Sequence, residues 1–145
     1  MKNNFYYKRQ FSNIYKKSSR FSEITSQILY GEKFKILSKK KDWIKIKSLF
    51  DNYVGYIKNE KYVKNYKPTH KVYSLKAIIF SRPNNKTKKF LPFASKFSII
   101  DENKYYLKFE KNKWLKKKDI KKMKNKEKDF TKIIRLFLKT KYVWG

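Results

Sequence analysis

The chain is 145 residues long, enough for one average domain or two small ones, and its 40 Lys and Arg against 11 Asp and Glu give a formal net charge of +29. Because 19% of the residues are aromatic, a disordered polycation is excluded, since disordered chains lack the apolar groups that offset the entropy of ordering. The absence of Cys and the single histidine, His70, exclude a cysteine nucleophile and a His-rich metal site, and we predict no catalytic residue, metal or cofactor among these residues.

The N-terminal segment has the sequence MKNNFYYKRQFSNIYKK. It contains no continuous apolar stretch and no small-residue cleavage site, so it does not have the pattern of a signal peptide. We therefore expect a cytoplasmic protein, or an exported or wall-associated one if the true N-terminus differs. No window approaches 18 uninterrupted apolar residues, and no membrane span is predicted.

Residues 26–57 have the two-residue period of β-structure. Phe34 and Ile36 alternate with lysines, and Ile44 and Ile46 do the same in the next segment. The charged residues 39–42 between these segments are typical of a hairpin tip. Strands this short, joined by polar turns, predict a small barrel or a strongly bent sheet.

The same pattern recurs later in the chain. Residues 31–37 line up with residues 94–100, residues 43–46 with 106–109, and, after a shorter loop, residues 56–58 with 114–116. This agreement in hydrophobic phase predicts two tandem copies of one β-module, each about 60 residues long. We place the first at residues 1–66, with an N-terminal extension, and the second at residues 67–123.

The character of the sequence changes in residues 124–145. A lysine-rich linker leads to apolar residues with the i, i+3, i+4, i+7 spacing of one helix face, which are Phe130, Ile133, Ile134 and Phe137. The chain then stops at Trp144 and Gly145 directly after the predicted helix. We interpret this segment as a linker, a helix and the start of a third domain that is cut short.

Five segments carry a family resemblance. Residues 26–32 (Ser-Gln-Ile-Leu-Tyr-Gly-Glu), with Asp42-Trp43 and residues 52–57, resemble the first bacterial SH3 domain of NlpC-type cell-wall peptidases. Residues 69–72 (Thr-His-Lys-Val) resemble the opening of the second SH3 domain of those proteins. Residues 137–145 are similar to the Phe-Leu-Gly-Thr-Pro-Tyr-x-Trp-Gly-Gly segment that leads into their papain-like domain. The chain departs from the pattern by having Lys139 and Lys141 in place of Gly and Pro, and Tyr56 in place of Trp.

The resemblance implies a mainly β fold, with two tandem SH3-like small barrels followed by a C-terminal helix that begins a missing α+β papain-like domain. It also implies cleavage of peptidoglycan stem peptides, or of muropeptides, between γ-D-glutamate and a diamino acid. The catalytic Cys and His would lie in an intramolecular papain-like domain beyond Gly145. This chain alone is therefore not expected to be an enzyme.

The resemblance further implies a substrate-binding role for the first SH3-like domain. In the family this domain walls the substrate cleft and holds the free α-amine of the first L-Ala of the stem peptide with an acid and a tyrosine. The matching residues are Glu32 and Tyr53, with Tyr30 as a neighbour. The residues themselves leave another interpretation open, in which Glu32 pairs with a surface lysine and Tyr53 is an ordinary half-buried sheet residue.

The positive charge supports a second reading of the whole chain. All but four of its basic residues are Lys, and they are spread along its length. A genome rich in A and T would favour such a composition, and a dedicated nucleic-acid surface more often uses Arg. We therefore expect only non-specific, salt-dependent binding of nucleic acid. The alternative function is a free-standing, lysine-rich tandem SH3-like module that binds polyanions such as nucleic acid or wall polymer.

Overall fold

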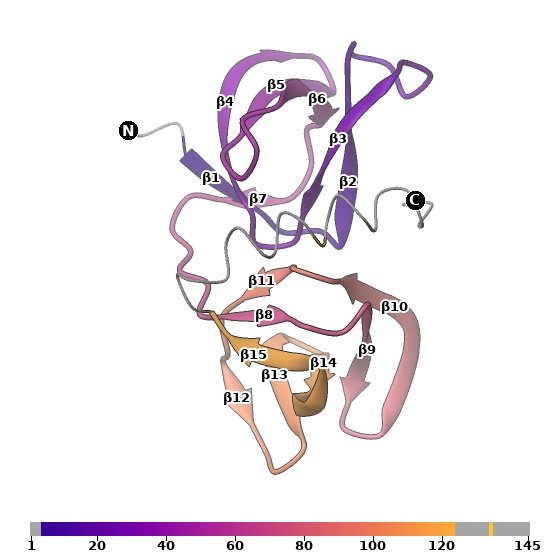
Figure 1. Ribbon diagram of the computed structural model, residues 1–145, viewed down its shortest axis with the longest axis vertical. Helices are drawn as coiled ribbons and strands as arrows, with labels where there is room; N and C mark the ends of the chain where they lie inside the picture. The colour runs from indigo at the N-terminus through magenta and orange to yellow at the C-terminus, as the bar shows by residue number, and fades with distance from the viewer. Residues whose placement is uncertain (1–3, 124–133, 135–145) are drawn as a thin grey trace. The chain divides into compact units, whose positions relative to one another are not determined.

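The computed structural model describes residues 4–123 and residue 134 (Figure 1). These residues are mainly β, as the alternating apolar pattern predicts. They belong to two compact units, and the boundary between the units along the chain lies between Tyr66 and Lys67. The predicted C-terminal helix and the start of a papain-like domain lie outside the described residues, except for Ile134. Within the described part of the chain, no helix has the length and apolar character needed to cross a membrane.

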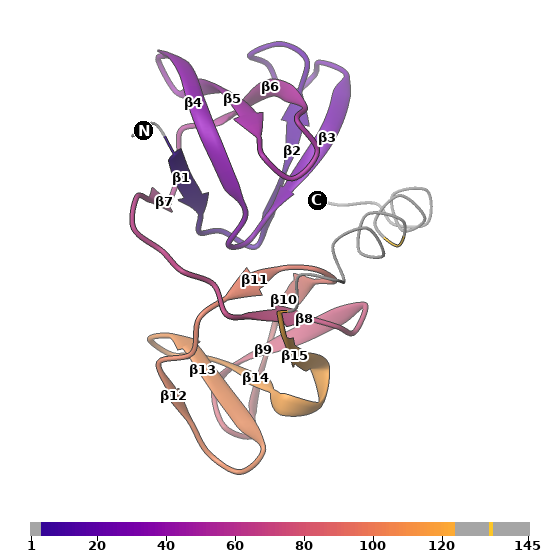
Figure 2. The same ribbon diagram turned by 60° about the vertical axis from the view of Figure 1, so that its left-hand side comes forward.

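The first unit is one antiparallel sheet with the strand order β3-β2-β6-β5-β4-β1-β7. Its strands are β1 (Asn4–Tyr7), β2 (Phe11–Tyr15), β3 (Ile24–Leu29), β4 (Lys33–Lys40), β5 (Trp43–Ser48), β6 (Val54–Lys58) and β7 (Tyr62–Val63). Figure 2 shows the sheet curled around its own interior. Alternation explains this arrangement, since every second residue of β5 is buried while the lysines between them face outward.

The interior of the first unit is an apolar cluster to which most of its strands contribute. Its buried members are Tyr7, Ile14, Ile28, Phe34, Ile44, Ile46 and Ile57. Gly55 allows β6 to lie tightly against β2, because a Cβ atom at this position would be 2.5 Å from the Cγ2 atom of Ile14 and 2.6 Å from the carbonyl oxygen of Tyr15.

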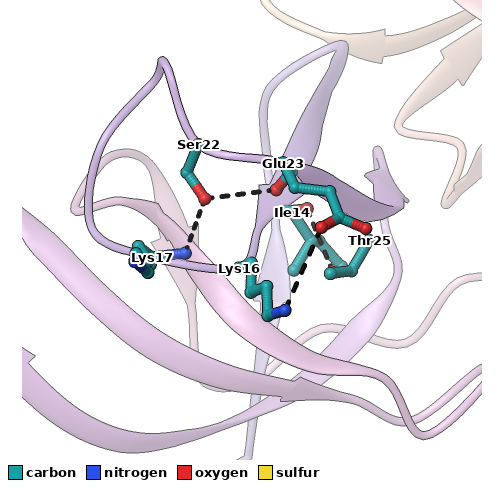
Figure 3. Close-up of polar contacts among 6 residues, drawn as sticks. All are labelled: Ile14, Lys16, Lys17, Ser22, Glu23 and Thr25. Carbon is teal, nitrogen blue, oxygen red and sulfur yellow. Dashed lines mark hydrogen bonds and ion pairs between the residues drawn. The ribbon is translucent and has the colours of Figure 1, made fainter.

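The hairpin tip between β2 and β3 is held by its own polar side chains (Figure 3). The Lys17 backbone N–H donates to Ser22 Oγ at 2.9 Å, and Thr25 Oγ1 donates to the Ile14 carbonyl at 3.1 Å. Lys16 Nζ lies 4.0 Å from Glu23 Oε1. Both side chains of this last pair are largely exposed, so the ion pair adds little to stability.

The second unit has two antiparallel sheets, with strand orders β10-β9-β14-β13-β12 and β11-β8-β15. Its elements are β8 (His70–Val72), β9 (Lys76–Arg82), β10 (Asn85–Pro92), β11 (Lys96–Phe97), β12 (Asp101–Glu102), β13 (Tyr106–Glu110), β14 (Lys113–Lys116), the single 3-10 turn η1 (Lys117–Asp119) and β15 (Ile120–Lys122). Its buried residues include Val72, Phe97 and Leu115.

The strand register of the two units matches the repeat that the sequence predicts. In the first unit Ile44 pairs with Ile57 across β5 and β6. In the second, the residues that align with this pair, Leu107 and Leu115, face each other across β13 and β14. Because the aligned parts of the two hairpins have the same register, their aligned residues can be compared.

Candidate functional site

Glu32 lies in the tight turn that joins β3 to β4. The backbone N–H of Glu32 donates to the Leu29 carbonyl at 3.0 Å, and Gly31 has a φ of 79°, which only glycine adopts without strain. The Glu32 carboxylate closes the turn from the other side, because its Oε1 accepts a hydrogen bond from the Leu29 N–H at 3.0 Å. The side chain is buried, with 2% relative exposure. Glu32 is therefore part of the framework of this turn.

The second unit contains the same turn without the acid. Ser95 donates its N–H to the Pro92 carbonyl at 3.1 Å, and Ala94 takes the place of Gly31 with a φ of 76°. Proline has no N–H, so a carboxylate at position 95 would find no backbone donor there. The Ser95 hydroxyl is buried and has no hydrogen-bond partner among the described residues. The acid thus occurs in the copy of the turn that offers it a donor.

Tyr30 and Tyr53 have very different exposures. Tyr30 is buried at 1% exposure, and Lys8 Nζ lies 4.9 Å from the centre of its ring. Tyr53, in the connection between β5 and β6, is 48% exposed. Its carbonyl accepts the Ser48 N–H at 2.9 Å, which orders the connection. Of the two tyrosines, Tyr53 is the one that a ligand in solvent can reach.

The backbone links the segments that carry Glu32 and Tyr53. The Leu49 N–H donates to the carbonyl of Lys33, the residue after Glu32, at 3.0 Å. The start of the β5–β6 connection therefore lies against the start of β4. Glu32 and Tyr53 thus come from adjacent segments of one unit, and Tyr30 lies in the same turn as Glu32.

Asp51 is a further acid in this connection, which the sequence analysis did not select. Its Oδ2 accepts a hydrogen bond from Ser26 Oγ at 2.7 Å, and its Oδ1 lies 3.4 Å from the donating N–H of Tyr53. Ser26 is buried on β3, so Asp51 ties the connection to the sheet and holds Tyr53 in place. A serine that faces an Asp-Asn turn is too common a pattern for the sequence alone to identify this contact.

The pKa values of two other side chains, Tyr7 and His70, are shifted from their ordinary values. Burial raises the pKa of Tyr7 to about 12, with a smaller contribution from the charge of Glu60. Burial lowers the pKa of His70, and the charge of Lys122 adds to the effect. The His70 ring stacks on Phe97 with 6.1 Å between ring centres, as expected for a structural residue.

No group of three or more His, Asp or Glu residues within the described ranges could hold a metal ion.

Comparison with known families identifies the first unit. Residues 14–61 match the family model described as the bacterial dipeptidyl-peptidase SH3 domain. These residues are therefore similar to a bacterial SH3 domain. The match includes the turn of Tyr30 and Glu32 as well as the connection of Asp51 and Tyr53, and it confirms the resemblance predicted from residues 26–32 and 52–57.

The first unit and the unit that follows it also resemble a solved structure. An NlpC/P60 family protein from Bacillus cereus ATCC 10987 has a TM-score of 0.67 and 13% sequence identity to this chain. The likeness covers 83% of this chain and 56% of that chain, so this chain spans a little over half of the length of that protein. At this identity the likeness shows the fold, and it confirms the predicted SH3-like β architecture. No curated protein matches the chain.

Proposed function

We propose that this chain is the non-catalytic targeting and substrate-gating region of a peptidoglycan stem-peptide hydrolase. The full-length protein would be a cysteine peptidase, with a papain-like domain that cleaves between γ-D-glutamate and a diamino acid. Two observations support the proposal, namely the match of residues 14–61 to a dipeptidyl-peptidase SH3 domain and the likeness of the fold to an NlpC/P60 protein. The 145 residues contain no Cys, so the chain itself would contribute binding and not chemistry.

The observation that carries the proposal is the joining of the Glu32 turn to the Tyr53 connection. The proposed ligand is the free α-ammonium group of the first residue of a stem peptide or muropeptide. Glu32 would act from beneath the surface through its charge, while the half-exposed Tyr53 would make the direct contact. A carboxylate can accept about four hydrogen bonds, and the bond from the Leu29 N–H is one of those that Glu32 makes. In a strongly basic chain, a carboxylate would favour a ligand that carries a positively charged group.

A pair of stem tripeptides tests this proposal. The first has a free N-terminal amine and the second is N-acetylated, which removes the ammonium charge and leaves the rest of the peptide intact. Isothermal titration calorimetry on the whole chain should show at least about tenfold tighter binding of the free amine, because a charged hydrogen bond is worth about 1.5–3 kcal/mol. Equal affinity for the two peptides would contradict the proposed recognition of the amine.

Variants identify the residues involved. Glu32→Gln keeps an acceptor for Leu29 while removing the charge, and it should abolish the preference for the free amine. Tyr53→Ala should weaken binding of both peptides. Asp42→Asn is the matched control, because it removes an exposed acid at the β4–β5 hairpin tip of the same unit. If Asp42→Asn reduces binding as much as Glu32→Gln does, the effect comes from net charge and the assignment of Glu32 is wrong.

A further inference from the structure

The second unit contains a hollow of about 460 Å³. This volume lies within the range of about 300–1,000 Å³ that is typical of small-molecule sites. Its lining comes from the β9–β10 turn, the start of β13, the end of β14 and the η1 turn. The lining residues are Asn84, Tyr105, Tyr106, Lys116, Lys117 and Lys118.

The lining combines positive charge with an open aromatic face. Lys117 Nζ pairs with Glu102 Oε1 at 2.9 Å, whereas Lys118 makes no ion pair with any residue in the described part of the chain. Tyr105 is 65% exposed, and Lys104 Nζ lies 5.4 Å from the centre of its ring. The lining therefore holds three lysines and a largely exposed aromatic ring.

One wall of the hollow is held in place by hydrogen bonds. The Tyr106 hydroxyl donates to Asn84 Oδ1 at 3.1 Å, and the Lys117 N–H donates to the Tyr105 carbonyl at 2.9 Å. The first of these bonds connects β13 to the β9–β10 turn, and the second connects η1 to the residue before β13. The geometry of the lining is thus set by the fold, and a ligand would find it already formed.

The corresponding corner of the first unit carries different side chains, although the chain is rich in lysine throughout. The bond from the Asn59 N–H to the Asp42 carbonyl, at 2.7 Å, is the counterpart of the bond from Lys117 to Tyr105. In this alignment Asp42 corresponds to Tyr105, and Glu60 corresponds to Lys118. Glu60 is moreover paired with Arg9 at 3.1 Å. One composition and one fold thus place two acids at this corner in the first unit, and an aromatic ring and a lysine in the second.

We propose that this hollow binds a nucleotide unit, with the phosphate held by Lys116 to Lys118 and the base stacked on Tyr105. Lysine binds phosphate as a compact point charge, and stacking of a base on an exposed aromatic ring contributes about 1–3 kcal/mol. Either a free nucleotide or one residue of a single strand has this chemistry. A phosphate polymer without bases would contact the lysines but would have no ring to stack on Tyr105.

Fluorescence anisotropy with the whole chain tests the proposal at about 150 mM salt, where diffuse attraction is screened. The probes are a labelled thymidine oligonucleotide and, as competitors, a free nucleoside monophosphate and inorganic polyphosphate. We expect the oligonucleotide to be displaced by an unlabelled strand far better than by polyphosphate of equal charge. Effective displacement by the monophosphate identifies a free nucleotide as the ligand, and weak displacement identifies a strand.

Three variants separate the hollow from general charge. Lys118→Glu, which introduces the residue of the first unit, should weaken binding about tenfold, whereas Lys39→Glu changes the net charge equally at an exposed site of the first unit and should weaken it less than about twofold. Tyr105→Ala should weaken binding of the oligonucleotide about tenfold and leave polyphosphate unaffected. Equal effects of Lys118→Glu and Lys39→Glu, or no effect of Tyr105→Ala, would overturn the proposal. Circular dichroism confirms that each variant is folded.

Discussion

The carboxylate of Glu32 and the backbone N–H of Leu29 are hydrogen-bonded across a turn at 3.0 Å, and the corresponding positions of the second unit hold Ser95 and Pro92. The acid and the donor are present together in one copy and absent together from the other. This pairing gives Glu32 a structural role alongside the ligand-binding role proposed for it.

Replacement of Glu32 should distinguish these two roles. Glu32→Ala leaves the Leu29 N–H without its acceptor in a buried turn, which should cost about 1–3 kcal/mol in the free energy of unfolding. Glu32→Gln keeps an acceptor and should cost clearly less. Ser95→Ala is the control, because it removes a buried hydroxyl that has no partner among the described residues, and it should be neutral or stabilising. Urea unfolding measures all three, and an equal loss for Ala and Gln at position 32 would refute the structural role.

Exchange of the residues with positive φ in the two copies of the turn should have opposite effects. Gly31→Ala introduces a side chain at a φ of 79° and should destabilise the protein by about 1–2 kcal/mol. Ala94→Gly relieves the same strain at a φ of 76°, partly offset by the greater freedom of glycine in the unfolded chain. It should therefore be neutral or stabilising. Thermal unfolding of the two variants checks the signs, and a marked destabilisation by Ala94→Gly would show that the strain argument fails.

The contact between Ser26 and Asp51 should be measurable by a double-mutant cycle. Asp51→Ala removes the acceptor of a buried hydroxyl and releases the connection that carries Tyr53, so we expect a loss of about 1–2 kcal/mol. Ser26→Ala removes the donor. Because the two residues act through one contact, the double variant should be less destabilised than the sum of the single ones, by about 1 kcal/mol. Strict additivity would mean that the hydrogen bond contributes nothing.

His70 should make stability depend on pH. Its pKa is lowered in the folded state, first by burial and then by the charge of Lys122, so the unfolded chain takes up the proton more readily. The stability that this residue contributes is complete above its ordinary pKa of about 6.5 and is lost as the pH falls below that value. The Tm should therefore decrease between about pH 7 and pH 5 at constant ionic strength. His70→Gln should flatten the profile, and an unchanged slope in that variant would assign the effect to other groups.

Local patterns in the sequence determined the class of this fold and its internal repeat. The alternation around Ile44 and Ile46 predicts which face of a strand is buried. A glycine in a turn, such as Gly31, indicates a positive φ angle. Both signals lie within a few residues, so the β class and the alignment of Ile57 with Leu115 follow from the sequence. The family resemblance of the first unit also rests on short contiguous motifs.

The tertiary structure decided which polar groups meet. A carboxylate in the sequence shows no partner, and only the closed turn gives Glu32 the N–H of Leu29. The link between Asp51 and Ser26 joins segments that are far apart along the chain. The basic hollow of the second unit likewise gathers Asn84, Tyr105 and Lys118 from three separate segments. Hydrophobic periodicity predicts which residues of a single strand are buried. A binding site depends on contacts between residues of different strands, and these form only when the chain folds.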